Sequence, residues 1–156
     1  MGLAEDRLEA LGLELPVISS KGKGIVPVKK IGNLLYTSGH GPEDQNTGEP
    51  LWTGKLGKDL TVEQGYEAAR ACGLILLSQL KRFLGDLERI DSIVKVFGLV
   101  ASAEDFYDQP AVMHGCSDLM VEVFGERGRH ARSAMGTFVL PKNIPVEIEM
   151  IVQVRA

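Results

Sequence analysis

The stretch GRHARSAMGTFVLPKNIPVEIEMIVQV, residues 128–154, decides the fold of this chain. Two strand-like runs in it, 133–140 and 146–154, flank a turn that begins and ends with proline, 141–145. In the second run every other residue is apolar, and these residues are Val146, Ile148, Met150 and Val152. Alternation with a period of two is the pattern of a strand with one buried face, so the stretch predicts two paired strands.

Two charged residues of this stretch, Arg132 and Glu147, are its clearest candidates for a chemical role. A carboxylate in an otherwise apolar strand is costly unless it is paired, so Glu147 and nearby Glu149 need an explanation. An arginine binds a carboxylate through two parallel hydrogen bonds, and a glutamate can transfer protons. Arg132 and Glu147 are therefore the candidate catalytic residues, and Glu149 is assigned a structural role. From the residues alone, a surface ion pair for Arg132 and a cross-strand pair for Glu147 remain open.

Upstream of this stretch, the patterns first predict a hairpin and a long helix. Apolar runs at 25–31 and 34–39 flank the pair Gly32-Asn33, which tolerates the positive φ angles of a hairpin turn. Residues 61–85 have capping-box spacing at their start, one apolar face, and a glycine at their end. They predict the clearest helix of the chain.

A central strand and a second helix follow. Residues 93–101 are apolar on both faces apart from Lys95, as expected for a strand that is covered on both sides. Residues 110–124 predict a helix with Asp108 as its cap. A short helix is also expected at 3–11. The order of these elements indicates an α+β domain with two helices on one face of a mixed sheet.

Composition limits the possible functions. The 156 residues fit one domain, and the net charge of −4 argues against nucleic acid or an anionic membrane as partners. Cys72 and Cys116 fall in predicted helices without metal-ligand spacing, which favours buried thiols. The chain has no membrane-spanning run and no signal peptide at its start, so we expect a cytoplasmic protein.

The histidines do not indicate a metal site. His40, His114 and His130 are scattered along the sequence without the spacing of metal ligands. His114 and His130 have no partners that the sequence can name, so both are assigned structural roles. His40 directly follows the hairpin, where it can titrate near neutral pH and contribute to binding.

Three pieces of the chain together resemble the RidA/YjgF family, also labelled endoribonuclease L-PSP. They are H-A-R-S-A…L-P…V-E-I-E at the C-terminus, I-G-N-L-L-Y-T-S-G-H at 31–40 with T-G-E at 47–49, and D-S-I-V-K-V-F-G-L-V at 91–100. Their order and spacing follow the family from about Gly24 onward. We therefore expect an N-terminal arm with a short helix at 1–23 and a single RidA-like domain at 24–156.

The resemblance implies a chorismate-mutase-like fold, with a six-stranded mixed sheet and two helices on one face. It also implies a homotrimer with active sites between subunits, to which residues near Ser117 would contribute across the boundary from Arg132. On this basis, a charge at Ile148 or Met150 is expected to break the trimer and the pocket together.

The resemblance also assigns site residues. Arg132 matches the family's substrate-carboxylate ligand, and Glu147 matches the acid that holds the catalytic water. The remaining matched pocket positions are Gly39, His40, Ser117 and Ala134. His40 stands where glutamine is common, Ser117 where the family has asparagine, and Ala134 where it often has cysteine. The family's tyrosine near residues 25–26 is absent.

The implied activity is hydrolysis of reactive enamines and imines, such as 2-aminoacrylate, to 2-oxo acids and ammonia. It requires no metal and no organic cofactor, because the imine carbon is already electrophilic. The departures in the pocket leave a non-catalytic trimer that binds 2-oxo acids as the alternative. A ribonuclease is disfavoured by the acidic composition.

Overall fold

The computed structural model describes residues 2–17 and 24–156. Its helices are α1 (Leu3–Ala10), α2 (Val62–Leu84) and α3 (Gln109–Phe124). Its strands are β1 (Val28–Ile31), β2 (Leu34–Thr37), β3 (Ile90–Ala101), β4 (Ala131–Thr137) and β5 (Val146–Val154). Short 3₁₀ turns, η1 (Leu87–Arg89), η2 (Gly125–Gly128) and η3 (Pro141–Asn143), join some of these elements. The predicted boundary between residues 23 and 24 lies at the edge of a segment outside the described residues.

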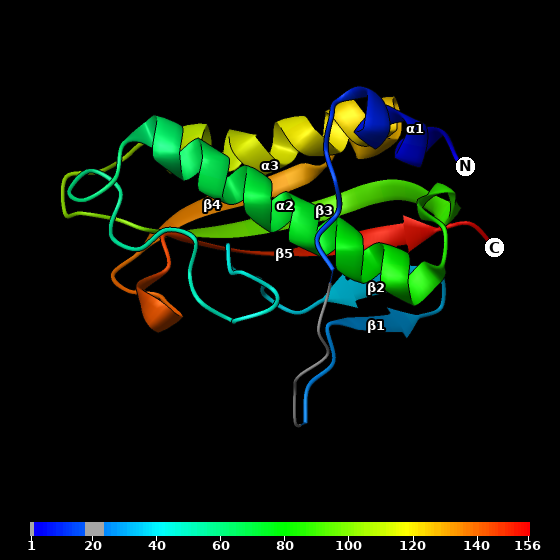
Figure 1. Ribbon diagram of the computed structural model, residues 1–156, viewed down its shortest axis with the longest axis horizontal. Coiled ribbons are helices and arrows are strands. Elements are labelled where there is room, and N and C mark those ends of the chain that lie inside the picture. Colours follow the sequence, from blue (N-terminus) through cyan, green and yellow to red (C-terminus); the bar gives the residue numbers. More distant parts are fainter. Residues whose placement is uncertain (1, 18–23) are drawn as a thin grey trace.

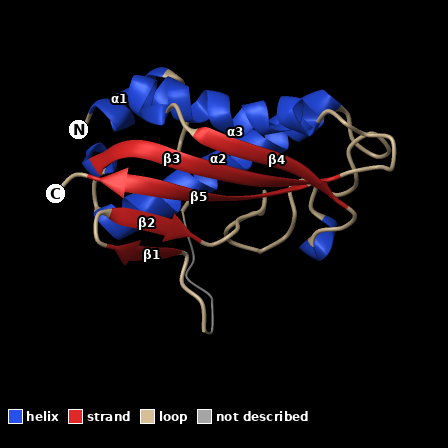
Figure 2. Ribbon diagram, turned by 180° about the vertical axis from the view of Figure 1, so that it is seen from behind, coloured by secondary structure: helices blue, strands red, loops and turns tan. Residues whose placement is uncertain are grey.

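The strands form one mixed sheet in the order β1-β2-β5-β3-β4, and the helices cover one of its faces (Figure 1). From the other side, Figure 2 shows the sheet in front and the helices behind it. On the covered face, Val96 of β3 is opposite Met150 of β5, and both side chains are buried. On the open face, Leu99 is opposite Glu147, and both are partly exposed. The alternation in the sequence therefore separates a helix-covered face from an open one.

The expected fold class is confirmed, but two of its details are wrong. The sheet has five strands rather than six, and the described residues form three α-helices rather than two. Residues 38–60 make only isolated bridges to the rest of the sheet, such as that between His40 and Ile148. This segment contains several glycines and prolines, which weaken or interrupt a hydrogen-bonded strand ladder.

The two C-terminal strands do not pair with each other. β3 lies between them, parallel to β4 and antiparallel to β5. β3 is the longest strand and is mostly apolar on both faces, whereas no residue of β4 is buried and β4 occupies one edge of the sheet. The connection at 138–145 includes Pro141 and Pro145 and residues with positive φ at 142 and 143, so it crosses over instead of closing a tight hairpin.

The helix boundaries follow their sequence signals. Thr61 and Gln64 form the expected capping box of α2, and Gly85 ends the helix with a φ of 83°. Asp108 occupies the cap position of α3, but its side chain makes no capping hydrogen bond. Cys72 and Cys116 are buried as expected. Among the described residues, no helix is long and apolar enough to cross a membrane.

The N-terminal helix is part of the folded core. Leu8 of α1 is buried in the main apolar core, and α1 lies beside α3 (Figure 1). The Ala4 N–H donates a hydrogen bond to a Glu88 carboxylate oxygen at 2.7 Å. The Arg7 guanidinium donates to the Val123 carbonyl oxygen at 3.1 Å, which ties α1 to the end of α3. These contacts hold both ends of α1 against η1 and α3.

The positions expected at a subunit boundary are also corrected. Ile148 and Met150 face the helices and are almost fully buried, with 0% and 2% exposure. A charge at either position would therefore disrupt the core of one subunit, whatever its effect on a trimer. The open face instead carries Phe97 and Ile151, both partly exposed.

Candidate functional site

Arg132 lies on β4 beside Val96 and is held in place by α3. One of its terminal nitrogens, Nη1, donates a hydrogen bond to Ser117 Oγ at 3.1 Å. The same nitrogen lies 3.1 Å from His114 Nδ1. Ser117 and His114 are three residues apart on α3, so they lie on one face of that helix. The guanidinium is therefore fixed by two side chains from a neighbouring element.

His130 extends this network. Its Nδ1 lies 2.6 Å from the Gly128 carbonyl oxygen, and its Nε2 lies 2.9 Å from Ser117 Oγ. A carbonyl can only accept, so the proton is on Nδ1, and Nε2 accepts from the Ser117 hydroxyl. Burial lowers the pKa of His130 and Arg132 lowers it further, although the Gly128 hydrogen bond opposes them. His130 is thus held as a neutral acceptor.

A cavity of about 460 Å³, here called the Arg132 cavity, opens over these groups. Its lining residues are His114, Ser117, Val121, Arg129, His130 and Arg132. Among the described residues, nothing accepts a hydrogen bond from Nε or Nη2 of Arg132. A planar pair of N–H groups matches the geometry of a carboxylate, so the cavity suits a small anion.

A second group, here called the Glu147 site, forms where the segment after β2 crosses β5. Gly39 approaches Glu147 so closely that a Cβ on Gly39 would lie 2.9 Å from Glu147 Oε2. Partial burial raises the pKa of Glu147, and the negative charges of Glu149 and Glu43 raise it further. A carboxylate with a raised pKa is a stronger base than an ordinary one.

His40 adjoins the Glu147 site through the backbone. Its N–H and carbonyl pair with Ile148 of β5, and its Nδ1 lies 2.7 Å from the Ser38 carbonyl oxygen. Burial lowers the pKa of His40, and the Ser38 hydrogen bond and the charge of Glu43 oppose this shift. His40 is therefore held in place more firmly than the histidine of an exposed loop would be.

The sequence-predicted residues thus form two groups rather than one pocket. Arg132 and Ser117 share the Arg132 cavity, and Ala134 follows two residues later on β4. The second group comprises Gly39, His40 and Glu147. Because Arg132 is beside Val96 and Glu147 is opposite Leu99, the two charged residues are on opposite faces of the sheet with β3 between their strands.

Three expectations about individual residues change as a result. Ser117 is not across a boundary from Arg132, because the two are hydrogen-bonded within one chain. His114 and His130, which the sequence left with structural roles, line the Arg132 cavity. His130 and Arg132 are two residues apart directly before the predicted strand 133–140, and an extended backbone there would place them on one face, which is the signal that could have paired them.

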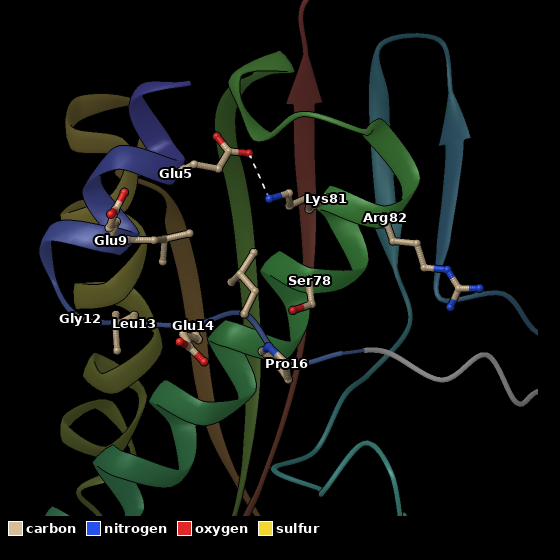
Figure 3. A pocket seen from close by; sticks show the side chains of 11 residues that line it. Glu5, Glu9, Gly12, Leu13, Glu14, Pro16, Ser78, Lys81 and Arg82 are labelled. Carbon is tan, nitrogen blue, oxygen red and sulfur yellow. Dashed lines mark ion pairs between the residues drawn. The ribbon is translucent and has the colours of Figure 1, made fainter. Parts of the chain in front are cut away.

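A cavity larger than the Arg132 cavity lies elsewhere among the described residues and contains none of the predicted site residues. It has a volume of about 770 Å³ and lies between α1, the segment after it, and α2 (Figure 3). Its lining includes three leucines and Pro16, and Glu5 and Lys81 form an ion pair at 3.7 Å there. Among the described residues, no group of His, Cys, Asp or Glu is arranged to hold a metal ion.

Comparison with known proteins now decides the family. A family model described as "YjgF/chorismate mutase-like, putative endoribonuclease" matches residues 5–153. The chain belongs to the YjgF family. The resemblance to RidA/YjgF proteins is thereby confirmed, and the match begins well before Gly24 and includes most of α1.

Three known proteins are similar to this chain over nearly its whole length. Protein TCP17 of Trypanosoma cruzi is 40% identical over 153 residues, which cover 97% of this chain and 94% of TCP17. The crystal structure of Atu1372 from Agrobacterium tumefaciens, a protein "with unknown function", is 41% identical with a TM-score of 0.89, covering 99% of this chain and 93% of that one. A "putative endoribonuclease" from Shewanella oneidensis is 35% identical with a TM-score of 0.92, covering 98% and 100%.

Proposed function

We propose that this YjgF-family protein hydrolyses small, reactive imino acids such as 2-aminoacrylate to 2-oxo acids and ammonia. The observation that carries the proposal is the position of Arg132. Ser117 and His114 contact only its Nη1, which leaves the N–H groups of Nε and Nη2 available to a ligand in the cavity that Arg132 lines. Such a prearranged pair of donors binds a carboxylate without first having to reorganise.

Glu147 supplies the acid–base chemistry in this proposal. It takes a proton from water, and the water oxygen bonds to the imine carbon. The same proton then passes to the imine nitrogen, which gives a carbinolamine. The hydroxyl proton of the carbinolamine next passes to that nitrogen through Glu147, the C–N bond breaks, and ammonia leaves as the C=O bond forms. The raised pKa of Glu147 favours this exchange, because it makes the carboxylate a stronger base.

Because Arg132 and Glu147 are on opposite faces of one sheet, we assign the Glu147 of each site to a neighbouring copy of the chain. The open face of the sheet supports such an assembly. Tyr36, Phe97 and Ile151 line a shallow apolar hollow on it together with Lys95 and Glu149. Exposed apolar groups rimmed by charge are typical of protein interfaces. We propose a homotrimer, as the family resemblance implies, with a site at each subunit boundary.

The test is a coupled assay in which a pyridoxal-phosphate enzyme generates 2-aminoacrylate and pyruvate formation is followed. The wild-type protein should accelerate hydrolysis, and Arg132→Ala should abolish the acceleration. Arg132→Lys should restore only part of it, because an ammonium lacks the planar pair of donors. If pyruvate binds but no imino acid is hydrolysed faster, the protein is instead a non-catalytic binding trimer.

The side chains that line the Arg132 cavity also favour a second candidate function, which is RNA cleavage. Two arginines and two histidines line it, and this combination can bind a phosphate and transfer protons. The net charge of −4 weighs against a long RNA partner. Cleavage of a short RNA that is lost in Arg132→Ala and His130→Gln would replace the deaminase proposal.

A further inference from the structure

We propose that the Arg132 cavity binds a small carboxylate together with a proton, and that His130 takes up the proton. The inference rests on the proposed function only in taking the ligand of Arg132 to be a carboxylate. It concerns how the ligand is held, so it is independent of whether the bound molecule is hydrolysed.

The starting point is the direction of each hydrogen bond in the cavity. The Ser117 hydroxyl donates to His130 Nε2, so its proton is not directed at the cavity. Its oxygen accepts from Arg132 Nη1. A hydroxyl has one proton and two acceptor positions, so Ser117 cannot also donate to a ligand in this state.

A proton on His130 Nε2 reverses one of these bonds. The imidazolium then donates to Ser117 Oγ, which can accept from His130 and Arg132 at once. The hydroxyl proton is released from His130 and can donate to a carboxylate held by Arg132. One proton therefore adds both a positive charge and a new hydrogen-bond donor to the anion site.

His130 is better suited to this role than His114. His114 accepts a hydrogen bond from Arg132 through Nδ1. A guanidinium can only donate, so a proton on that nitrogen would break the contact and place two donors face to face. Ser117, by contrast, can reverse its direction. The proton thus goes to the histidine whose neighbour is a hydroxyl.

The surrounding charges also favour protonation of His130 when a carboxylate binds. Arg132 on β4 and Arg129 before it are the cations on this cavity, and His114 is the other titratable group facing from α3. Arg129 is already paired with Glu126 of η2 at 3.2 Å. Arg132 is one cause of the lowered pKa of His130. A carboxylate on Arg132 would offset that repulsion and raise the pKa of His130 again.

This reciprocal coupling sets the pH dependence of binding. A ligand that raises the pKa of a group takes up a proton when it binds between the two pKa values. Affinity should therefore fall as pH rises through that window, by up to about tenfold per pH unit for one linked proton. An anion site that uses Arg132 alone would bind with the same affinity across the window, because arginine stays charged.

The experiment is calorimetry with pyruvate between about pH 5 and pH 7.5, in paired buffers of different ionisation enthalpy. The difference between buffers gives the number of protons taken up. We expect proton uptake in the wild type and none in His130→Gln, which keeps an acceptor for Ser117 but cannot be protonated. His114→Gln is the matched control and should retain the uptake. Methyl pyruvate, which lacks the carboxylate, should cause none.

Pyruvate affinity that is constant over this range, or uptake that persists in His130→Gln, would overturn the inference. Complete absence of pyruvate binding would overturn it as well. Failure of the proposed deaminase activity is a separate result, because it would appear as absent turnover alongside intact proton-coupled binding.

Discussion

Glu147 is the residue whose environment most clearly favours function over stability. Its raised pKa means that the folded chain holds this proton more tightly than the unfolded chain does. Folding stability therefore decreases as pH rises through the raised pKa. The Glu147→Gln substitution removes this pH-dependent contribution to folding stability. The variant should lose turnover without becoming less stable.

We expect the Glu147→Gln variant to match the wild type in thermal denaturation at low pH and to be slightly more stable above neutral pH. The effect should be small, because Glu147 is partly exposed and solvent screens its charge. A variant less stable than the wild type at both pH values would contradict this account of Glu147.

Gly39, which lies against Glu147, gives a second prediction about a single residue. A Cβ at this position would push on the Glu147 carboxylate, which is the movable end of a side chain. Gly39→Ala should therefore lower the turnover number while leaving the melting temperature and the affinity for pyruvate nearly unchanged. Gly41→Ala is not a suitable control, because its Cβ would meet Ile144 instead. An unchanged turnover number would exclude a role for the Gly39–Glu147 contact.

Whether the role of a residue can be predicted depends on how far away in the sequence the residues that it contacts are. Arg132, Ser117 and Glu147 are predicted as site residues because the family resemblance marks them in the sequence. His130 was missed because its role arises only when β4 and α3 meet, and its partner Ser117 is 13 residues away. Period and spacing report contacts within one element, but not contacts between elements.

At the scale of elements, the sequence predicts types well and arrangement poorly. α2 is recovered at both ends because its capping box and terminal glycine are local signals. The neighbours of β4 and β5 are not recovered, since the central place of β3 depends on contacts between distant segments. The apolar character of β3 on both faces was the correct clue to a central strand.

Whether helix α1 is part of the folded core can be tested by two leucine substitutions. Leu8 is 4% exposed, so Leu8→Ala should lower the free energy of unfolding by about 2–5 kcal/mol. Leu11, at the end of the same helix, is 42% exposed, so Leu11→Ala should cost less than about 0.5 kcal/mol. Urea denaturation measures both variants. Equal, small effects would mean that α1 is a loosely attached arm rather than part of the core.

For the whole molecule, the proposed homotrimer depends on the open face of the sheet as its interface. Phe97 is partly exposed there and lines the apolar hollow. Phe97→Glu should dissociate the trimer and remove activity while leaving a folded subunit, as seen by sedimentation and circular dichroism. Phe83→Glu, at a 46% exposed position on α2, is the matched control and should remain trimeric. A trimeric, active Phe97→Glu protein would show that the open face is not the interface.

The central claim is that each active site combines Arg132 of one subunit with Glu147 of its neighbour. Subunits carrying Arg132→Ala and subunits carrying Glu147→Gln should each be inactive when assembled alone. When the two are dissociated and reassembled together in equal amounts, one half of the subunits retain Arg132 and one half of their neighbours retain Glu147. About one quarter of the sites (1/2 × 1/2) should then be restored, relative to wild-type protein treated in the same way. A mixture that forms mixed trimers and stays as inactive as its parents would contradict the account.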